Sequence, residues 1–229
     1  MMKRTVEPEW LDGLPEKDPH AVRSRLDLRR VNFIMGNARI VARELNRIFP
    51  GDGPQRILEL GAGDGTFALR LAREFSERWR SVELTLVDRQ NLADPEISRK
   101  FRQLGWSAQF ISADVFDFLA TCEPVDCIFT NLFLHHFEPG KLSTLLGFVA
   151  AKTKAFVACE PRRTPSALAG TKLLGLIGCN AVTRHDATIS VRAGFRGREV
   201  SGLWPLAVDW KIEEVKRGFF SHTFVAARR

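Results

Sequence analysis

The amino-acid sequence predicts an α/β fold: a seven-stranded, mostly parallel sheet with helices on both faces and an antiparallel last strand. Between residues 56 and 160, short apolar runs alternate with stretches in which apolar residues recur at helical spacing. This alternation is typical of a parallel sheet whose strands are connected by helices. Two later runs, Trp210–Val215 and Phe219–Ala226, flank the tight turn Arg217-Gly218 and predict an antiparallel hairpin. A length of 229 residues is ordinary for one such domain.

The residues before the first strand predict a helical extension over residues 1–50 that covers the main domain at 51–229. Residues 1–20 contain three prolines and are expected to be irregular or lightly docked. Helical spacing of apolar residues from Ala21 to Phe49, with a glycine at position 36, predicts two helices broken near that glycine. Asn32 and Asn37 lie near the break. Each is a candidate for ligand contact, although ordinary packing of these helices on the sheet explains them as well.

The turn that follows the first strand is the most informative segment of the chain. Arg56–Leu60 has the pattern of a buried strand, and Gly61, Gly63 and Gly65 follow it at a spacing of two before a helical pattern begins. Glycines permit tight backbone dihedrals and let a ligand approach the main chain closely. Strand, glycine-rich turn and helix N-terminus in this order predict a cradle for a nucleotide cofactor.

Two details distinguish this cradle from a dinucleotide site. A dinucleotide fingerprint has its third glycine one position later, where Thr66 stands. The turn is also flanked by Glu59 and Asp64, whose negative charges suit a cationic group better than a pyrophosphate. A dinucleotide fold nevertheless remains an alternative at this point.

Acidic residues also follow the next two strands. Val82–Asp88 is a strand pattern that ends in an acid, and a carboxylate at this position can accept two hydrogen bonds from ribose hydroxyls. Gln109–Val115 is a third strand pattern and contains Asp114. A fourth strand pattern, Val125–Asn131, leads through a short loop into the pair His135-His136.

Together these motifs resemble those of class I S-adenosylmethionine-dependent methyltransferases, which have a Rossmann-like fold. The segment from Asp126 to His136 is similar to the corresponding one in small-molecule methyltransferases of the ubiquinone/menaquinone biosynthesis group. The resemblance covers about residues 50 to 160. It implies S-adenosylmethionine as the cofactor, with the methionine part beside the glycine turn, the ribose on the second strand and the adenine after the third. The residues implied are Glu59, Gly61, Gly63, Gly65, Asp88, Arg89 (beside the base), Asp114, Val115 and Asn131 (backbone to the cofactor amine).

Candidates for contact with the methyl acceptor come from the ends of the fourth and fifth strands and from a helical cover at about residues 162–194. They are His135, His136, His185 and Glu160. A histidine titrates near neutral pH and can take a phenolic proton, and Glu160 can orient a substrate hydroxyl. Structural roles remain open for both: the histidine pair can stabilise its loop, and the glutamate can cap a helix or pair with Arg162 or Arg163.

The cover itself is predicted as two helices. The segment from Ser166 to Asn180 is apolar on nearly all sides and indicates a helix over an apolar pocket, an interfacial helix or a dimer face. A shorter helix is predicted near residues 186–194, with Asp186 as its N-cap and Gly194 just past its end.

Composition narrows the class of protein. The chain is 45% hydrophobic and 27% charged, has no long apolar segment and begins without an apolar signal sequence, so we expect a cytoplasmic globular enzyme, monomeric or homodimeric. Its four cysteines show no metal or disulfide spacing, and we expect them to be reduced, with no zinc or other metal bound. The net charge of +7 comes from scattered arginines, which makes nucleic acid an unlikely partner and leaves contact with a membrane surface possible.

The sequence therefore predicts methyl transfer from S-adenosylmethionine to a small, hydrophobic, aromatic acceptor of polyketide or quinone type, with oxygen favoured over carbon or nitrogen. The apolar cover and the 17 phenylalanines suggest this acceptor. Two alternatives remain: a methyltransferase acting on RNA or another macromolecule, and a cofactor-binding partner protein without catalytic activity.

Overall fold

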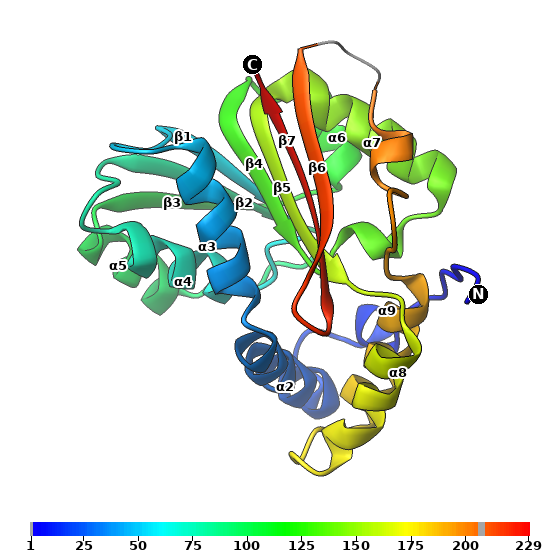
Figure 1. The fold of residues 1–229 in the computed structure, drawn as a ribbon. Helices are drawn as coiled ribbons and strands as arrows, with labels where there is room; N and C mark the ends of the chain where they lie inside the picture. The colour runs from blue at the N-terminus through cyan, green and yellow to red at the C-terminus, as the bar shows by residue number, and fades with distance from the viewer. Residues whose placement is uncertain (1, 206–208) are drawn as a thin grey trace.

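A computed structural model describes residues 2–205 and 209–229 of the chain, and these residues form one seven-stranded sheet (Figure 1). The strands lie in the order β3-β2-β1-β4-β5-β7-β6. β7 runs antiparallel to both of its neighbours, and the other pairs are parallel. The predicted fold class is confirmed. The strands are β1 (Arg56–Leu60), β2 (Val82–Asp88), β3 (Trp106–Ser112), β4 (Val125–Asn131), β5 (Thr153–Pro161), β6 (Trp210–Arg217) and β7 (Ser221–Arg228).

Helices cover both faces of the sheet because its central strands are apolar on both sides. Ile57 of β1 belongs to a core with α3, α4 and α5, whereas the next residue, Leu58, packs in a second core with α6 and α7. Alternate side chains of a strand point to opposite faces, so β1 divides the two cores. The helices are α3 (Asn37–Ile48), α4 (Thr66–Phe75), α5 (Pro95–Gln103), α6 (Val115–Thr121) and α7 (Pro139–Lys152).

The predicted break in the N-terminal helices is confirmed. α2 (Pro19–Met35) ends at Gly36, whose φ of 69° is left-handed, and α3 begins at the next residue. Asp18 caps α2, because its carboxylate accepts hydrogen bonds from the backbone N–H groups of His20 and Ala21. The sharp turn at the glycine lets α2 leave the sheet and lie across the carboxyl ends of its strands.

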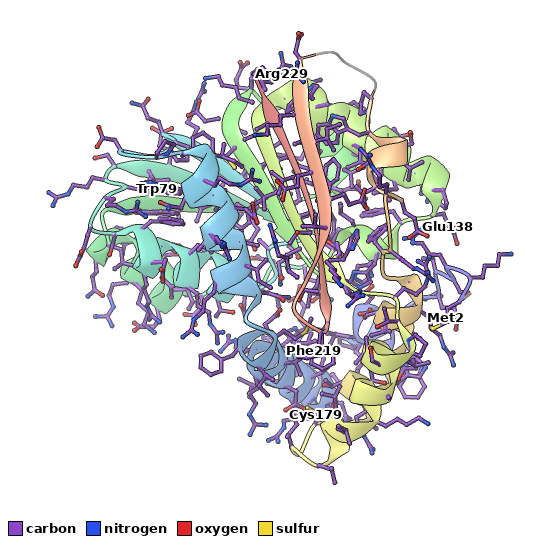
Figure 2. The ribbon with its side chains drawn as sticks, viewed as in Figure 1. Met2, Trp79, Glu138, Cys179, Phe219 and Arg229 are labelled. Carbon is purple, nitrogen blue, oxygen red and sulfur yellow. The ribbon has the colours of Figure 1, made fainter. Side chains whose placement is uncertain are left out.

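The first residues of the chain are more firmly attached than the sequence predicted. The guanidinium of Arg4 donates hydrogen bonds to the carbonyls of Ala193, His135 and Phe137, and Arg163 donates to the carbonyl of Met2. Met2 accordingly lies on the same side of the molecule as Glu138 (Figure 2). A short helix, α1 (Trp10–Gly13), follows. The expectation of an irregular segment is thus wrong at α1, and the prolines gave no sign of these contacts, which are made to distant parts of the chain.

The helical cover differs from the prediction in its helix boundaries. α8 (Pro165–Lys172) is shorter than expected, and a 3-10 turn and Gly178, at φ 77°, separate it from α9 (Ala181–Ala193). Asn180, rather than Asp186, caps α9, and Gly194 ends it in an extended conformation. Asp186 lies inside the helix and is used elsewhere. α2, α8 and α9 gather beyond one end of the sheet (Figure 1).

Two further predictions concern membrane-spanning helices and the cysteines. None of the described helices is long and apolar enough to cross a membrane. The four cysteines are free, three of them buried, as expected for reduced packing residues.

Candidate active site

The glycine turn after β1 is held tightly against the neighbouring strand. The backbone N–H groups of Gly61 and Ala62 both donate to the carbonyl of Val87 in β2. Gly61 has φ 69°, and a Cβ there would lie 2.3 Å from the ring of Phe133. Gly65 has φ 74° and is also closely packed, whereas a Cβ on Gly63 would meet open space. The backbone favours glycine at all three positions, since Gly63 also has a left-handed φ of 55°; the first and third are closely packed as well, and the second faces an open space.

Asp88 joins this turn to the end of β2. Its carboxylate accepts hydrogen bonds from the N–H of Gly63 at 2.8 Å and from the N–H of Gln90 at 2.9 Å. Gly63 and Asp88 line one small hollow, with residues 90–93 and 110–112 on its other sides. The hollow thus lies at the carboxyl ends of parallel strands, where α/β sheets bind ligands.

The residues predicted to hold an adenine lie next to this hollow. β3 ends at Ser112, earlier than predicted, and Asp114 caps α6 by accepting from the N–H of Phe116 at 2.9 Å. Asp114 is exposed and does not itself line the hollow, whereas Ser112 does. Val115 is buried in the first turn of α6, and the side chain of Arg89 is exposed.

Glu59 is a buried carboxyl group directly below the glycine turn. Its side chain lies on the α3 and α4 side of the sheet, and the residue is 1% exposed. One carboxyl oxygen, Oε2, has no hydrogen-bond partner within the described residues. Burial raises the pKa of Glu59 well above its ordinary value, and the negative charges of Asp64 and Asp88 raise it further. Such a group is suited to a cationic ligand.

α2 is attached to the turn by a charged contact. Two guanidinium nitrogens of Arg29 lie 2.8 and 2.6 Å from Oδ2 of Asp64, whose other oxygen accepts from the N–H of Thr66. Asp64 is thus occupied by protein groups, and α2 is fixed above the start of α4.

The asparagine that ends β4 also contacts the N-terminal helices. Its Oδ1 accepts a hydrogen bond from Nδ2 of Asn37 at 2.8 Å, and its Nδ2 donates to Oδ1 of Asn32 at 3.0 Å. The structure thus brings the side chains of Asn131, Asn32 and Asn37 together in one hydrogen-bonded group. Leu132, the next residue, has a φ of 53°, a strained conformation for a branched side chain that often marks a functional loop.

Glu160 organises the loop between β4 and α7. Its Oε1 accepts hydrogen bonds from the N–H groups of Phe133 and Leu134, and its Oε2 lies 2.8 Å from Nδ1 of His135. Because both oxygens are bonded and the residue is 1% exposed, the carboxylate holds the loop. Neither Arg162 nor Arg163 pairs with it among the described residues.

His135 lies between two carboxylates. Its Nδ1 faces Glu160, and its Nε2 lies 3.5 Å from an oxygen of Glu9, a residue of the N-terminal segment. Burial acts to lower the pKa of His135, but the hydrogen bond to Glu160 and the negative charges of Glu160 and Glu9 outweigh it and raise this pKa to about 9. His135 is therefore charged at neutral pH and cannot accept a proton.

His136 lies beside the same cluster but is partly exposed. Its Nδ1 is 3.6 Å from a carboxylate oxygen of Asp12. Burial and the neighbouring charge of His135 lower the pKa of His136, while Glu9 and Asp12 act in the opposite direction. Its imidazole is consequently neutral at neutral pH.

His185 forms a dyad with the adjacent residue of α9. Its Nδ1 lies 2.8 Å from Oδ1 of Asp186, and its ring stacks on Trp10 with a centroid distance of 3.6 Å. Asp186 also accepts from the N–H groups of Trp10 and Leu11, and so caps α1. With Nδ1 donating to the carboxylate, Nε2 of a neutral His185 is left as a proton acceptor.

Asp12 lies beside His136 at the open side of this cluster. One of its carboxylate oxygens is 3.6 Å from Nδ1 of His136, and its side chain is 62% exposed.

Sequence reasoning did not identify the contributions of Glu9, Asp12 and Arg29. Glu9 and Asp12 lie in the segment predicted to be lightly docked, and their partners are far along the chain. The only available signal was an acidic residue on each side of the aromatic Trp10, which spacing alone does not distinguish from a solvated turn.

Comparisons with known proteins agree with the fold. A family described as a methyltransferase domain matches residues 57–154, which include the glycine turn and β1 to β4. No curated protein matches the sequence. The predicted enzyme class, a methyltransferase that depends on S-adenosylmethionine, is supported by this match together with the fold of the solved structures that resemble the chain.

Three of these structures illustrate the fold. The plantazolicin methyltransferase BpumL, in complex with a triazolic desmethylPZN analog and SAH, is 14% identical, with a TM-score of 0.68 over 96% of this chain and 93% of that one. An O-methyltransferase family protein from Burkholderia thailandensis is 16% identical, with a TM-score of 0.62 over 92% and 60%. The magnesium protoporphyrin IX methyltransferase ChlM from Synechocystis PCC 6803, with bound SAH, is 13% identical, with a TM-score of 0.55 over 96% and 91%. At these identities the likeness establishes the fold alone.

Proposed function

We propose that this protein transfers the methyl group of S-adenosylmethionine to an oxygen atom of a small, apolar, aromatic acceptor of polyketide or quinone type. The observation that carries the proposal is the shared hollow of Gly63 and Asp88 at the carboxyl ends of parallel strands. The matched methyltransferase domain includes both residues. The proposed acceptor class also draws on the sequence resemblance between the loop after β4 and the ubiquinone/menaquinone biosynthesis methyltransferases. This resemblance was inferred from the sequence motif alone.

The cofactor side of the proposal follows the chain from β1 to β4. Glu59 and the backbone of Gly61, Gly63 and Gly65 would contact the methionine part, and the carboxylate of Asp88 would exchange its bond to Gly63 for the ribose hydroxyls. Arg89, Asp114 and Val115 would surround the adenine, and the backbone of Asn131 would meet the cofactor amine. One oxygen of Asp114 is used as a helix cap, which leaves the other for the amino group of the base.

The acceptor side centres on the dyad of His185 and Asp186. Methyl transfer to oxygen breaks the bond between the sulfonium sulfur and the methyl carbon, and forms the bond between carbon and oxygen. The hydroxyl proton must leave, and Nε2 of His185 would accept it. Trp10, which stacks on His185 and is 53% exposed, supplies an aromatic surface beside the base. His136, Glu160 and His135 would shape this side of the site, the last two through the loop that they hold.

The solved structures also bear on the acceptor. BpumL was solved with azolic desmethylPZN analogs, ChlM is named for magnesium protoporphyrin IX, and other neighbours are named as O-methyltransferases. These compounds belong to those proteins, and for the present chain they support only an acceptor of similar shape.

Binding experiments test the cofactor. We expect the wild-type protein to bind SAH and not NAD in calorimetric titrations. Asp88→Asn should weaken SAH binding at least about tenfold, because one charged acceptor of two hydroxyls is lost, whereas the exposed control Asp52→Asn should leave it unchanged. Tight binding of NAD without binding of SAH would refute the proposal.

Turnover experiments test the acceptor and separate the alternatives. SAH release should be detected with phenolic or enolic aromatic compounds, and His185→Gln should lower kcat by about 10²–10⁴ with little effect on SAH affinity. SAH binding without turnover of any acceptor would favour the noncatalytic partner protein. Strong, salt-dependent RNA binding would favour the macromolecular alternative.

A further inference from the structure

Three side chains from two distant segments meet beside the proposed acceptor site. Each of Glu9, His135 and His136 presents one potential metal ligand atom, and these atoms lie within 4.8 Å of one another. Glu9 comes from the N-terminal segment, and the histidines come from the turn after β4. The sequence predicted no metal, because the spacing of its histidines and cysteines has no ligand pattern.

The orientation of His135 is fixed from the side opposite Glu9. Its Nδ1 is 2.8 Å from Glu160, a carboxylate that also accepts hydrogen bonds from the backbone of the loop. A carboxylate behind the far nitrogen of an imidazole is the arrangement that orients most metal-binding histidines. The nitrogen that faces the cluster, Nε2, is buried and has no hydrogen-bond partner within the described residues.

The separation of one pair of ligand atoms, from His135 and Glu9, fits an ion better than a direct hydrogen bond. Nε2 of His135 is 3.5 Å from the nearest oxygen of Glu9. A hydrogen bond between such groups is usually shorter, at about 2.7–3.2 Å. Two ligands of a tetrahedral zinc ion, each bound at about 2.0–2.1 Å, are about 3.4 Å apart.

The burial and the charge of these three side chains also suit a metal ion. The side chains of Glu9 and His135 are 11% and 3% exposed, and that of His136 is 26% exposed. The hydroxyl of Ser190 donates to Glu9 and holds its carboxylate. Asp12, with an oxygen 3.6 Å from His136, adds a second negative charge at the open side. Two imidazoles and one carboxylate, with an opening to solvent, form the ligand set of catalytic zinc sites.

We propose that Glu9, His135 and His136 bind one divalent transition-metal ion, with Zn²⁺ the ion that suits these ligands. Glu160 and Ser190 orient two of the ligands, and one coordination position remains for an oxygen atom from outside the protein. That this oxygen belongs to the methyl acceptor rests on the proposed function. The metal site itself does not, because its ligands are distinct from the groups assigned to the cofactor.

Metal binding is best measured on the full-length protein, purified without a histidine tag and stripped with a chelator. Competition with a chromophoric chelator gives the Zn²⁺ affinity, and atomic emission after dialysis gives the stoichiometry. Co²⁺ provides a second readout, because four-coordinate Co²⁺ absorbs visible light much more strongly than the six-coordinate aqueous ion. We expect one ion per chain and the intense Co²⁺ band.

Two matched pairs of variants identify the ligands. Glu9→Gln and His136→Gln should each weaken Zn²⁺ binding at least tenfold, since loss even of an outer-shell partner costs about 10–100-fold. The controls Glu7→Gln and His20→Gln change an exposed residue of the same type and should bind Zn²⁺ as the wild type does. Thermal unfolding without metal checks that each variant is folded.

The proposal is overturned if the wild type binds no Zn²⁺ at micromolar concentration. It is equally overturned if Glu9→Gln and His136→Gln bind as tightly as their controls. If these variants do not fold, the wild-type protein still decides: a Co²⁺ spectrum equal to that of the aqueous ion excludes the site. SAH titration of the stripped protein is the separate test of the proposed function, so either proposal can fail while the other stands.

Discussion

The buried carboxyl group of Glu59 predicts that cofactor binding is linked to proton release. Burial and the charges of Asp64 and Asp88 raise its pKa, so the group holds a proton in the ligand-free protein at pH values above its ordinary pKa. A cationic ligand placed beside it favours the ionised form. Binding therefore releases up to one proton, and affinity increases with pH until the raised pKa is passed.

The size of the effect follows from the linkage of one proton. Within this pH window the affinity for SAH, whose ammonium group is cationic, should increase up to tenfold per pH unit, or about 1.4 kcal/mol. Glu59→Gln cannot ionise, so its affinity should not change over the same window. The ligand-free wild type should also lose stability as pH rises from the ordinary carboxyl pKa toward the raised one, because the unfolded chain then binds fewer protons than the folded one.

Calorimetry in two buffers of different ionisation enthalpy counts the released protons directly. Glu83→Gln, which changes an exposed carboxylate on β2, is the control and should behave as the wild type does. Titrations between about pH 5 and pH 7 stay below the pKa of an α-amino group, about 7.7–8.0. The reasoning is refuted if the wild type and Glu59→Gln show the same proton count and the same pH dependence.

Three further predictions concern stability. Gly61→Ala places a Cβ against Phe133 at a left-handed φ, so it should lower the free energy of unfolding by about 1–3 kcal/mol and abolish SAH binding. The control Gly140→Ala places its Cβ in open space and should have neither effect. Equal denaturation midpoints for the two variants would contradict this prediction. Glu160→Gln should cost about 1.5–3 kcal/mol in urea unfolding, because the loop after β4 loses a charged acceptor, and a wild-type midpoint would show that the loop does not need it. Burial acts to raise the pKa of Glu214, but hydrogen bonds from His222 and Ser201 lower it, so the ionised carboxylate stabilises the fold above the ordinary pKa and this stabilisation is lost as pH falls through the lowered pKa. The difference in unfolding free energy between the wild type and Glu214→Gln should therefore disappear in acid. A difference that does not depend on pH would contradict this prediction.

Much of the fold was predictable because its signals are local. The strand before the glycine turn is apolar on both sides, and the glycine at position 36 breaks a helical pattern, so burial and backbone freedom alone indicate these elements. The glycine turn is of the same kind: Gly61 and Gly65 adopt left-handed backbone conformations that other residues reach only with strain. The last residue of β3 and the first residue of α9 were predicted wrongly, because Asp114 and Asn180 act as helix N-caps and so define boundaries that the spacing of apolar residues does not show.

The amino-acid sequence by itself determined the order of strands and helices, the glycine cradle and the acid at the end of β2, because each depends on residues adjacent in the chain. The tertiary structure alone decided which polar groups meet. It places Glu9 against His135, stacks Trp10 on His185 and uses Glu160 to hold a loop. The physical reason is that a sequence pattern does not show which distant group a polar side chain will contact. That contact depends on how distant segments pack, and the two cores of the sheet determine this packing.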